Sequence, residues 1–155
     1  MIQMLCKEEL RKNEKRTYSL IYLSKIYIMN VLIYAFLILL IYFLAGISKV
    51  MNFSETVKGV ENMFFIKNLP TNFYNLAIIG VVLLEIFAPI MIMFSLYTNT
   101  FSEYAYYSSI GLAIFTILAT LIYHFPPNGS QYYTFMKNLT ATGSLMLLST
   151  HFNNM

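Results

Sequence analysis

The chain has 155 residues, of which 58% are hydrophobic and 11% charged, and its formal net charge at pH 7 is +3. Soluble domains carry about 25% charged residues, and a soluble helical bundle needs a polar outer face on every helix, so this composition argues against a soluble fold and indicates an integral membrane protein. Cys6 is the only cysteine, which rules out an intrachain disulfide, a CxxC redox pair and a thiolate metal cage within the chain.

A basic tail, residues 1–25, precedes the first apolar run. It holds six of the ten basic residues, namely Lys7, Arg11, Lys12, Lys15, Arg16 and Lys25. Positive charge beside a membrane helix favours the cytosolic side and contact with anionic lipid headgroups. We therefore expect a cytosolic N-terminus and no nucleic-acid partner.

The first predicted span covers residues 26–45, with Asn30 as its one strongly polar member. It is longer than the apolar region of a cleaved signal peptide, so a retained transmembrane helix is predicted.

A mixed connector, residues 46–74, follows this span. Apolar residues recur within it at helical spacing, opposite the charged Glu55, Lys58 and Glu61; they are Phe53, Val57, Val60 and Phe64. This pattern predicts an interfacial amphipathic helix between spans one and two. We expect Asn52 or Ser54 to cap its start and residues 67–70 to end it.

The second predicted span, residues 75–97, carries Glu85 near its centre as its only acidic or basic residue, and Pro89 lies one turn beyond. A charged side chain at mid-bilayer costs about 2.5 to 3.5 kcal/mol on insertion scales, so it persists where it is paired, protonated or useful. Glu85 is therefore the first candidate for a functional site.

The third and fourth predicted spans cover residues 103–123 and 133–150. The turn 98–102 is short enough to require an antiparallel hairpin, and the Pro-Pro-Asn-Gly run at 126–129 must break the helix after span three. Span four is the most polar, since it contains Lys137 and Asn138. Four spans would return the C-terminal tail, residues 151–155, to the cytosol. The predicted fold is thus an all-α, antiparallel four-helix transmembrane bundle.

This topology brings the end of span one, the end of span three and the start of span four to one face of the membrane. Lys49, His124 and Lys137 therefore converge, with Asn138 beside them, while Glu85 lies about 15 Å deeper at 1.5 Å per residue. We expect a loose polar network in a one-sided pocket rather than a tight pair. These five residues are the candidate pocket residues.

Small and polar residues also form a stripe on span three, at Ser109, Ala113, Thr116, Thr120 and His124. Such stripes are typical of close helix packing in membranes, and a packing seam is the favoured reading of this one.

Four short motifs resemble the DoxX-like integral membrane proteins. They are Ala45-Gly46-Ile47-Ser48-Lys49-Val50, Leu83-Leu84-Glu85-Ile86-Phe87, His124-Phe125, and Lys137-Asn138-Leu139 with Gly143. The resemblance covers residues 26–150 and implies a four-helix membrane domain. Ala88-Pro89 stands where glycines often follow the acidic residue in this family. Some members look like small subunits of quinone-reducing sulfur oxidoreductases and others associate with redox-stress enzymes, so the resemblance implies architecture better than activity.

Two functions remain open at this level. The first is a non-catalytic accessory or scaffold subunit with a soluble or membrane protein partner. The alternative is the membrane subunit of a quinone-linked oxidoreductase, with Glu85 as proton acceptor and His124 or Lys137 at a quinone carbonyl. A metal site is not expected, because Glu85 and His124 are too few ligands, and no cofactor fingerprint is evident. A small transporter or channel is disfavoured because Pro89 offers only one helix break and no inverted repeat is apparent.

Two Asn-x-Ser sequons, at Asn52 and Asn128, fall in the connectors on the predicted outer face. Both lie close to the membrane, where we expect little glycan transfer.

Overall fold

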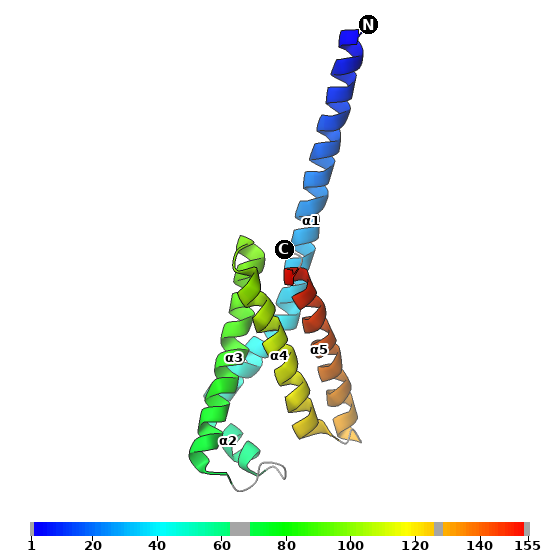
Figure 1. Cartoon of the computed structure of the whole chain (residues 1–155). Coiled ribbons are helices and arrows are strands. Elements are labelled where there is room, and N and C mark those ends of the chain that lie inside the picture. The colour runs from blue at the N-terminus through cyan, green and yellow to red at the C-terminus, as the bar shows by residue number, and fades with distance from the viewer. Residues whose placement is uncertain (1, 63–68, 126–128, 154–155) are drawn as a thin grey trace. The chain divides into compact units, whose positions relative to one another are not determined.

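The computed structural model describes residues 2–62, 69–125 and 129–153, which form helices and turns but no strand (Figure 1). The helices are α1 (Ile2–Met51), α2 (Phe53–Glu61), α3 (Thr71–Thr98), α4 (Ser102–His124) and α5 (Ser130–Asn153). The chain divides into two compact units, residues 1–34 and 35–155. The first unit is the N-terminal part of α1, so the described part of the basic tail is helical. The second unit holds the last part of α1 and the other four helices.

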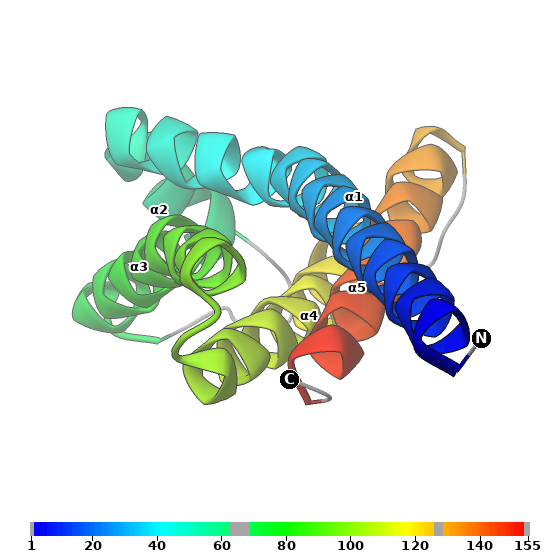
Figure 2. The same ribbon diagram turned by 90° about the horizontal axis from the view of Figure 1, so that it is seen from above.

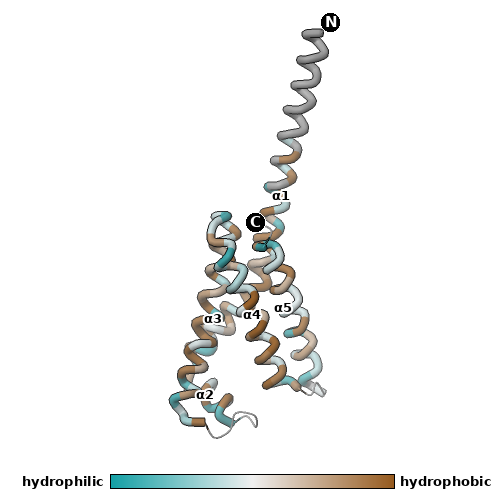
Figure 3. Tube along the Cα trace, viewed as in Figure 1, coloured by the Kyte–Doolittle hydropathy of each residue, from teal (hydrophilic) through white to brown (hydrophobic). Residues whose placement is uncertain are grey.

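Within the described residues, three helices are long and apolar enough to cross a membrane. These segments are Lys25–Met51, Thr71–Thr98 and Ser102–His124, and they contain the first three predicted spans, 26–45, 75–97 and 103–123. Figure 3 shows the apolar residues along α3 and α4, whereas α5 is paler and more polar. α5 contains the fourth predicted span but does not meet the same criterion of length and hydropathy.

α3 and α4 form the predicted hairpin, joined by the short turn 99–101. Asn99 ends α3 in the left-handed region, with φ 53°, and its N–H donates to the Ser95 carbonyl at 2.9 Å. Asparagine tolerates this conformation better than most residues. Phe101 is also left-handed, with φ 60°, and its ring lies 6.2 Å from that of Phe94 and 6.1 Å from that of Tyr104. These ring contacts help to hold a backbone conformation that phenylalanine rarely adopts.

α2 packs on the first turns of α3. Val57 and Val60 are buried in a cluster with Tyr74 and Ile78 of α3. The two valines are among the apolar residues predicted to share one face of this connector. Asn52 occupies the N-cap position without a capping hydrogen bond; its Nδ2 instead donates to the Ser48 carbonyl at 3.2 Å. Phe64 of the predicted apolar face, and residues 67 and 68 of the predicted helix end, lie outside the described residues.

α4 lies between α3 and α5 and packs against both (Figure 2). Ser109, Ala113, Thr116 and Thr120 are buried, as the predicted seam requires. The three hydroxyls donate to carbonyls one turn earlier in the same helix. Each of these hydroxyls thus has an acceptor within α4, which suits the stripe to close packing. Of the break predicted at residues 126–129, residues 126–128 fall outside the described residues, while α4 ends at His124 and Gly129 is left-handed, with φ 51°.

Candidate functional site

Glu85 is buried near the middle of α3, with 3% of its surface exposed. Pro89 lies four residues later in the same helix. Because proline has no N–H, the backbone carbonyl of Glu85 lacks its usual helical donor. Glu85 thus carries both a carboxylate and a backbone carbonyl without its helical hydrogen bond, within an apolar helix.

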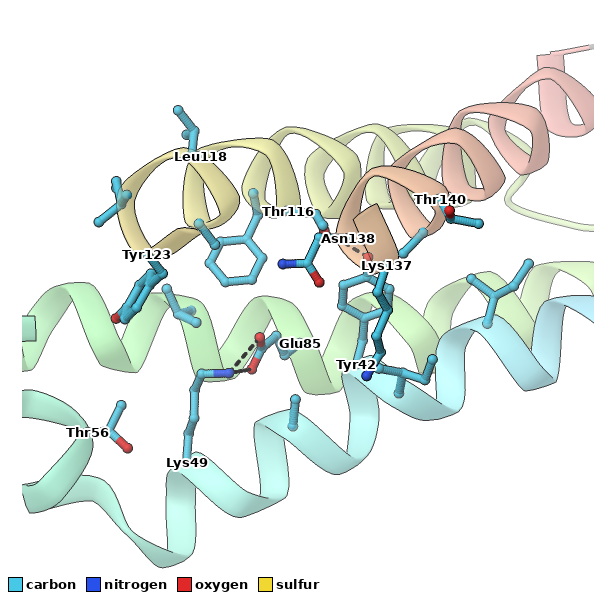
Figure 4. Close-up of a pocket in the computed structure, with 18 of the residues that line it drawn as sticks. Tyr42, Lys49, Thr56, Glu85, Thr116, Leu118, Tyr123, Lys137, Asn138 and Thr140 are labelled. Atoms are coloured by element: carbon cyan, nitrogen blue, oxygen red, sulfur yellow. Dashed lines mark hydrogen bonds and ion pairs between the residues drawn. The ribbon is translucent and has the colours of Figure 1, made fainter. Parts of the chain in front are cut away.

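Lys49 of α1 is the partner of Glu85. Its Nζ donates to both carboxylate oxygens at 2.7 Å (Figure 4). The expectation of a loose network without a tight pair is therefore wrong for these two residues. Ending the first span at residue 45 placed Lys49 too far out, whereas α1 continues to Met51. Since helical side chains tilt toward the helix N-terminus, Lys49 reaches back toward the deeper carboxylate.

Gly46 brings α1 and α3 together next to this pair. A Cβ at Gly46 would lie 2.8 Å from Ile86 Cγ1 and 3.1 Å from Glu85 Cβ. A side chain at this position would therefore push the helices apart. Glycine permits the close approach, one turn before Lys49 on α1, that allows the lysine to reach Glu85.

A second polar contact joins α1 to α4. The hydroxyls of Tyr42 and Thr116 lie 2.8 Å apart, and both residues are buried. Tyr42 precedes Lys49 by seven residues, which places both on one face of α1. The last part of α1 thus makes hydrogen bonds to α3 and to α4 from that face.

These contacts border a pocket of about 1130 Å³. Most of its lining is apolar, including Leu37 and Ile41 of α1 and Phe115 and Leu118 of α4. Among its described lining residues, the only lysine, arginine, histidine or acidic side chains are Lys49, Glu85 and Lys137. Ligand pockets typically measure about 300 to 1000 Å³ and combine apolar walls with a few convergent polar groups, so this pocket has the size and composition of a binding site for an apolar molecule.

Lys137 and Asn138 enter the pocket from α5, across from the ion pair (Figure 4). Among the described residues, neither the Lys137 ammonium nor the side-chain amide of Asn138 has a hydrogen-bond partner. Both groups can donate to a ligand. Four of the five candidate residues thus lie in the pocket lining.

His124 is the fifth candidate, and the structure does not bring it to the others. Its Nδ1 lies 2.6 Å from Oε1 of Gln131, and it is absent from the pocket lining. The neighbouring Tyr123 lines the pocket instead. Counting residues places both at the end of α4, but only the rotation of the helix decides which one lines the pocket.

Sequence reasoning did not single out Tyr42, Thr116 or Tyr123 as site residues. Thr116 did lie on the small and polar stripe predicted for span three, which was the available signal. No cluster of three histidine, cysteine, aspartate or glutamate residues that could hold a metal ion occurs in the described part of the chain.

These helices, with an ion pair between two of them and an apolar pocket beside it, define a small multi-pass integral membrane protein. A family model, that of DoxX, matches residues 31–125, more than half of the chain. The chain therefore belongs to the DoxX family, and the resemblance noted in its motifs is confirmed. The matched segment includes Gly46, Lys49 and Glu85 and ends before α5. No curated protein and no solved structure matched the chain.

Proposed function

We propose that the chain is a non-catalytic accessory or scaffold subunit of a membrane complex, in which the Lys49–Glu85 ion pair fixes the register of α1 against α3. The observation that carries this proposal is the engagement of both Glu85 oxygens by Lys49 at 2.7 Å. A carboxylate held in this way is poorly placed to take up a proton in turnover. It is well placed to penalise any arrangement of the helices that separates it from its cation.

In this proposal α5 is the fourth membrane span of an antiparallel bundle. α5 has 24 residues, about 36 Å at 1.5 Å per residue, against a hydrocarbon thickness of about 30 Å. Its hydroxyls donate to carbonyls of their own helix, at Thr140, Thr142, Ser144, Ser149 and Thr150. Hydroxyls satisfied in this way cost little within a membrane, which reconciles the polar sequence of α5 with a span.

The bundle is oriented with both termini in the cytosol, and α2 lies at the opposite interface. The charge of residues 1–25 supports this orientation through the excess of lysine and arginine in cytosolic segments. The burial pattern of α2 suits an interfacial position on either side, because Val57 and Val60 are buried while Glu55 and Lys58 remain exposed. An amphipathic helix of this kind suits the boundary between lipid and water.

The experiment is co-purification of the full-length tagged chain from its native membranes. An accessory subunit should carry a partner in constant ratio, and Glu85→Gln should reduce the recovery of that partner together with thermal stability. Glu55→Gln is the matched control, since Glu55 is exposed and outside the pocket. A Glu85→Gln protein that keeps its partner and its stability would remove the proposed role of the acid.

A second candidate is the membrane subunit of a quinone-linked oxidoreductase. The observation in its favour is the large apolar pocket into which Lys137 and Asn138 direct hydrogen-bond donors. Either donor would suit a quinone carbonyl, whereas His124 lies outside the pocket lining. Glu85 would have to leave Lys49 before it accepted a proton, and a partner would have to supply the electron carrier.

Organic extraction of the purified chain and its partners tests this candidate. Bound quinone in a near-stoichiometric amount would favour the oxidoreductase subunit, provided that less quinone is recovered with the Asn138→Ala variant. Native preparations that contain neither quinone nor a redox enzyme would argue against this candidate and favour the accessory subunit.

A further inference from the structure

The pocket contains one positive charge that the protein does not balance. Lys49 and Glu85 neutralise each other, as their 2.7 Å contacts require, and Lys137 is the remaining charged side chain in the lining. In the described part of the chain the Lys137 ammonium has no acidic or hydrogen-bonding partner. Lys137 is exposed, and an anion beside it at the apolar walls would accept a charge-assisted hydrogen bond from its ammonium.

The apolar lining of the pocket limits which anion could bind there. A volume of about 1130 Å³ lined mainly by aliphatic and aromatic side chains cannot be filled by a small hydrophilic anion, which would leave the apolar walls unoccupied. A neutral apolar molecule would fill the walls but leave Lys137 uncompensated. The pocket therefore matches a molecule with an extended apolar body and one negative charge at its head.

We propose that this pocket binds an acyl lipid whose head carries a single negative charge, with the head held by Lys137 and Asn138 and the aliphatic chain against the walls formed by α1 and α4. The Asn138 amide adds a directional hydrogen bond beside the lysine, since it also enters the pocket unpartnered by described residues (Figure 4). The carboxylate of a fatty acid and the phosphodiester of a phospholipid share this chemistry. Such a lipid site lies on the α5 side of the pocket and does not depend on the ion pair, so it goes beyond the accessory role.

Competition binding on the purified full-length protein in a neutral detergent tests this proposal. The probe is radiolabelled oleate. The competitors are oleyl alcohol, which has the same chain without the charge, and dioleoyl phosphatidylglycerol and dioleoyl phosphatidylcholine, which differ in net charge at equal acyl composition. The charged member of at least one pair should bind about tenfold more tightly than its uncharged counterpart, the effect expected from one charge-assisted hydrogen bond. Preference within the first pair identifies a fatty acid, and preference within the second identifies a phospholipid.

Variants then locate the effect. Lys137→Gln should abolish the preference for charge without altering thermal unfolding, because the lysine has no described partner to lose, and Lys137→Arg should retain the preference. Lys58→Gln, the same change on an exposed lysine outside the pocket, should have no effect. Ala141→Phe, within the lining, should weaken binding of every acyl competitor, while Leu147→Phe, at a position 73% exposed on the same helix, should not.

Three results would overturn the proposal. The first is equal affinity for the charged and uncharged member of both pairs. The second is a preference for charge that survives Lys137→Gln. The third is an equal loss with Lys58→Gln, which would indicate general attraction of lipids to a basic surface. None of these results bears on whether the chain carries a protein partner, so the accessory role is tested independently by the co-purification experiment.

Discussion

Lys49 Nζ lies 2.7 Å from both carboxylate oxygens of Glu85, and the two side chains differ in exposure, at 27% for the lysine and 4% for the acid. The lysine can turn toward water at the end of α1 if its partner is removed. The acid lies in the middle of α3 and cannot turn toward water in the same way. Unequal burial of the two partners should therefore make the effects of the two single substitutions unequal.

The first prediction concerns this asymmetry. Lys49→Met should lower the free energy of unfolding by about 3 to 5 kcal/mol, because it leaves a buried carboxylate without its cation. Glu85→Gln should cost less, since Lys49 can reorient toward the polar boundary of the membrane. Equilibrium unfolding in mixed detergent micelles measures both values.

The double variant Lys49→Met with Glu85→Leu, measured alongside the single variant Glu85→Leu, completes a double-mutant cycle. It should be closer to the wild type than Lys49→Met alone, because replacing both members of a buried pair by apolar groups removes the uncompensated charge. A double variant whose destabilisation equals the sum of the two single effects would contradict an energetic coupling between the residues.

The second prediction concerns Gly46. Gly46→Ala should destabilise the protein by about 1 to 3 kcal/mol, the usual cost of overpacking, because the added Cβ would lie 2.8 Å from Ile86 and 3.1 Å from Glu85 Cβ. Gly143→Ala is the matched control in α5, where no atom lies within 4 Å of the new Cβ. It should be neutral or stabilising by about 0.5 to 1 kcal/mol, as expected for glycine replaced in a helix. Equal effects of the two changes in thermal unfolding would argue against a close crossing at Gly46.

The third prediction concerns the contact between α1 and α4. Tyr42→Phe should cost about 0.6 kcal/mol and at most about 1.7 kcal/mol, the average and the largest value for hydrogen bonds between membrane helices, since the ring is kept and only the hydroxyl contact to Thr116 is lost. Thr116→Val should produce little further loss in the Tyr42→Phe background. If the two effects add fully when unfolding is measured, the hydroxyls do not interact.

The fourth prediction concerns the membrane topology. In a Cys6→Ser background, cysteines placed at Gly129 and at Asn153 flank α5, and a maleimide that cannot cross membranes should label them from opposite sides of sealed vesicles. A cysteine in place of Tyr18, which is exposed in the N-terminal part of α1, should be labelled from the same side as the one at Asn153. Labelling of Gly129→Cys and Asn153→Cys from one side would mean that α5 does not span the membrane.

Local properties of the chain were predictable without the fold. Hydropathy and length depend only on neighbouring residues, so the three apolar helices and the hairpin between α3 and α4 followed directly. The apolar face of α2 and the buried stripe through Ser109 and Thr116 followed from helical periodicity, because side chains three and four residues apart share a face. The isolation of Glu85 in an apolar helix was visible for the same reason.

The partner of Glu85 was decided by the tertiary structure. Topology alone brought Lys49, His124 and Lys137 to one side of the membrane, and it could not rank them. That choice depended on how far α1 continues beyond residue 45, on the close approach at Gly46, and on the rotation of α4 that brings Tyr123 and not His124 to the pocket lining. The sequence by itself determined which residue needed a partner, because the cost of burying a charge is a local property of that residue. Only the packing of the helices determined which cation reached it and which one, Lys137, was left facing an open pocket.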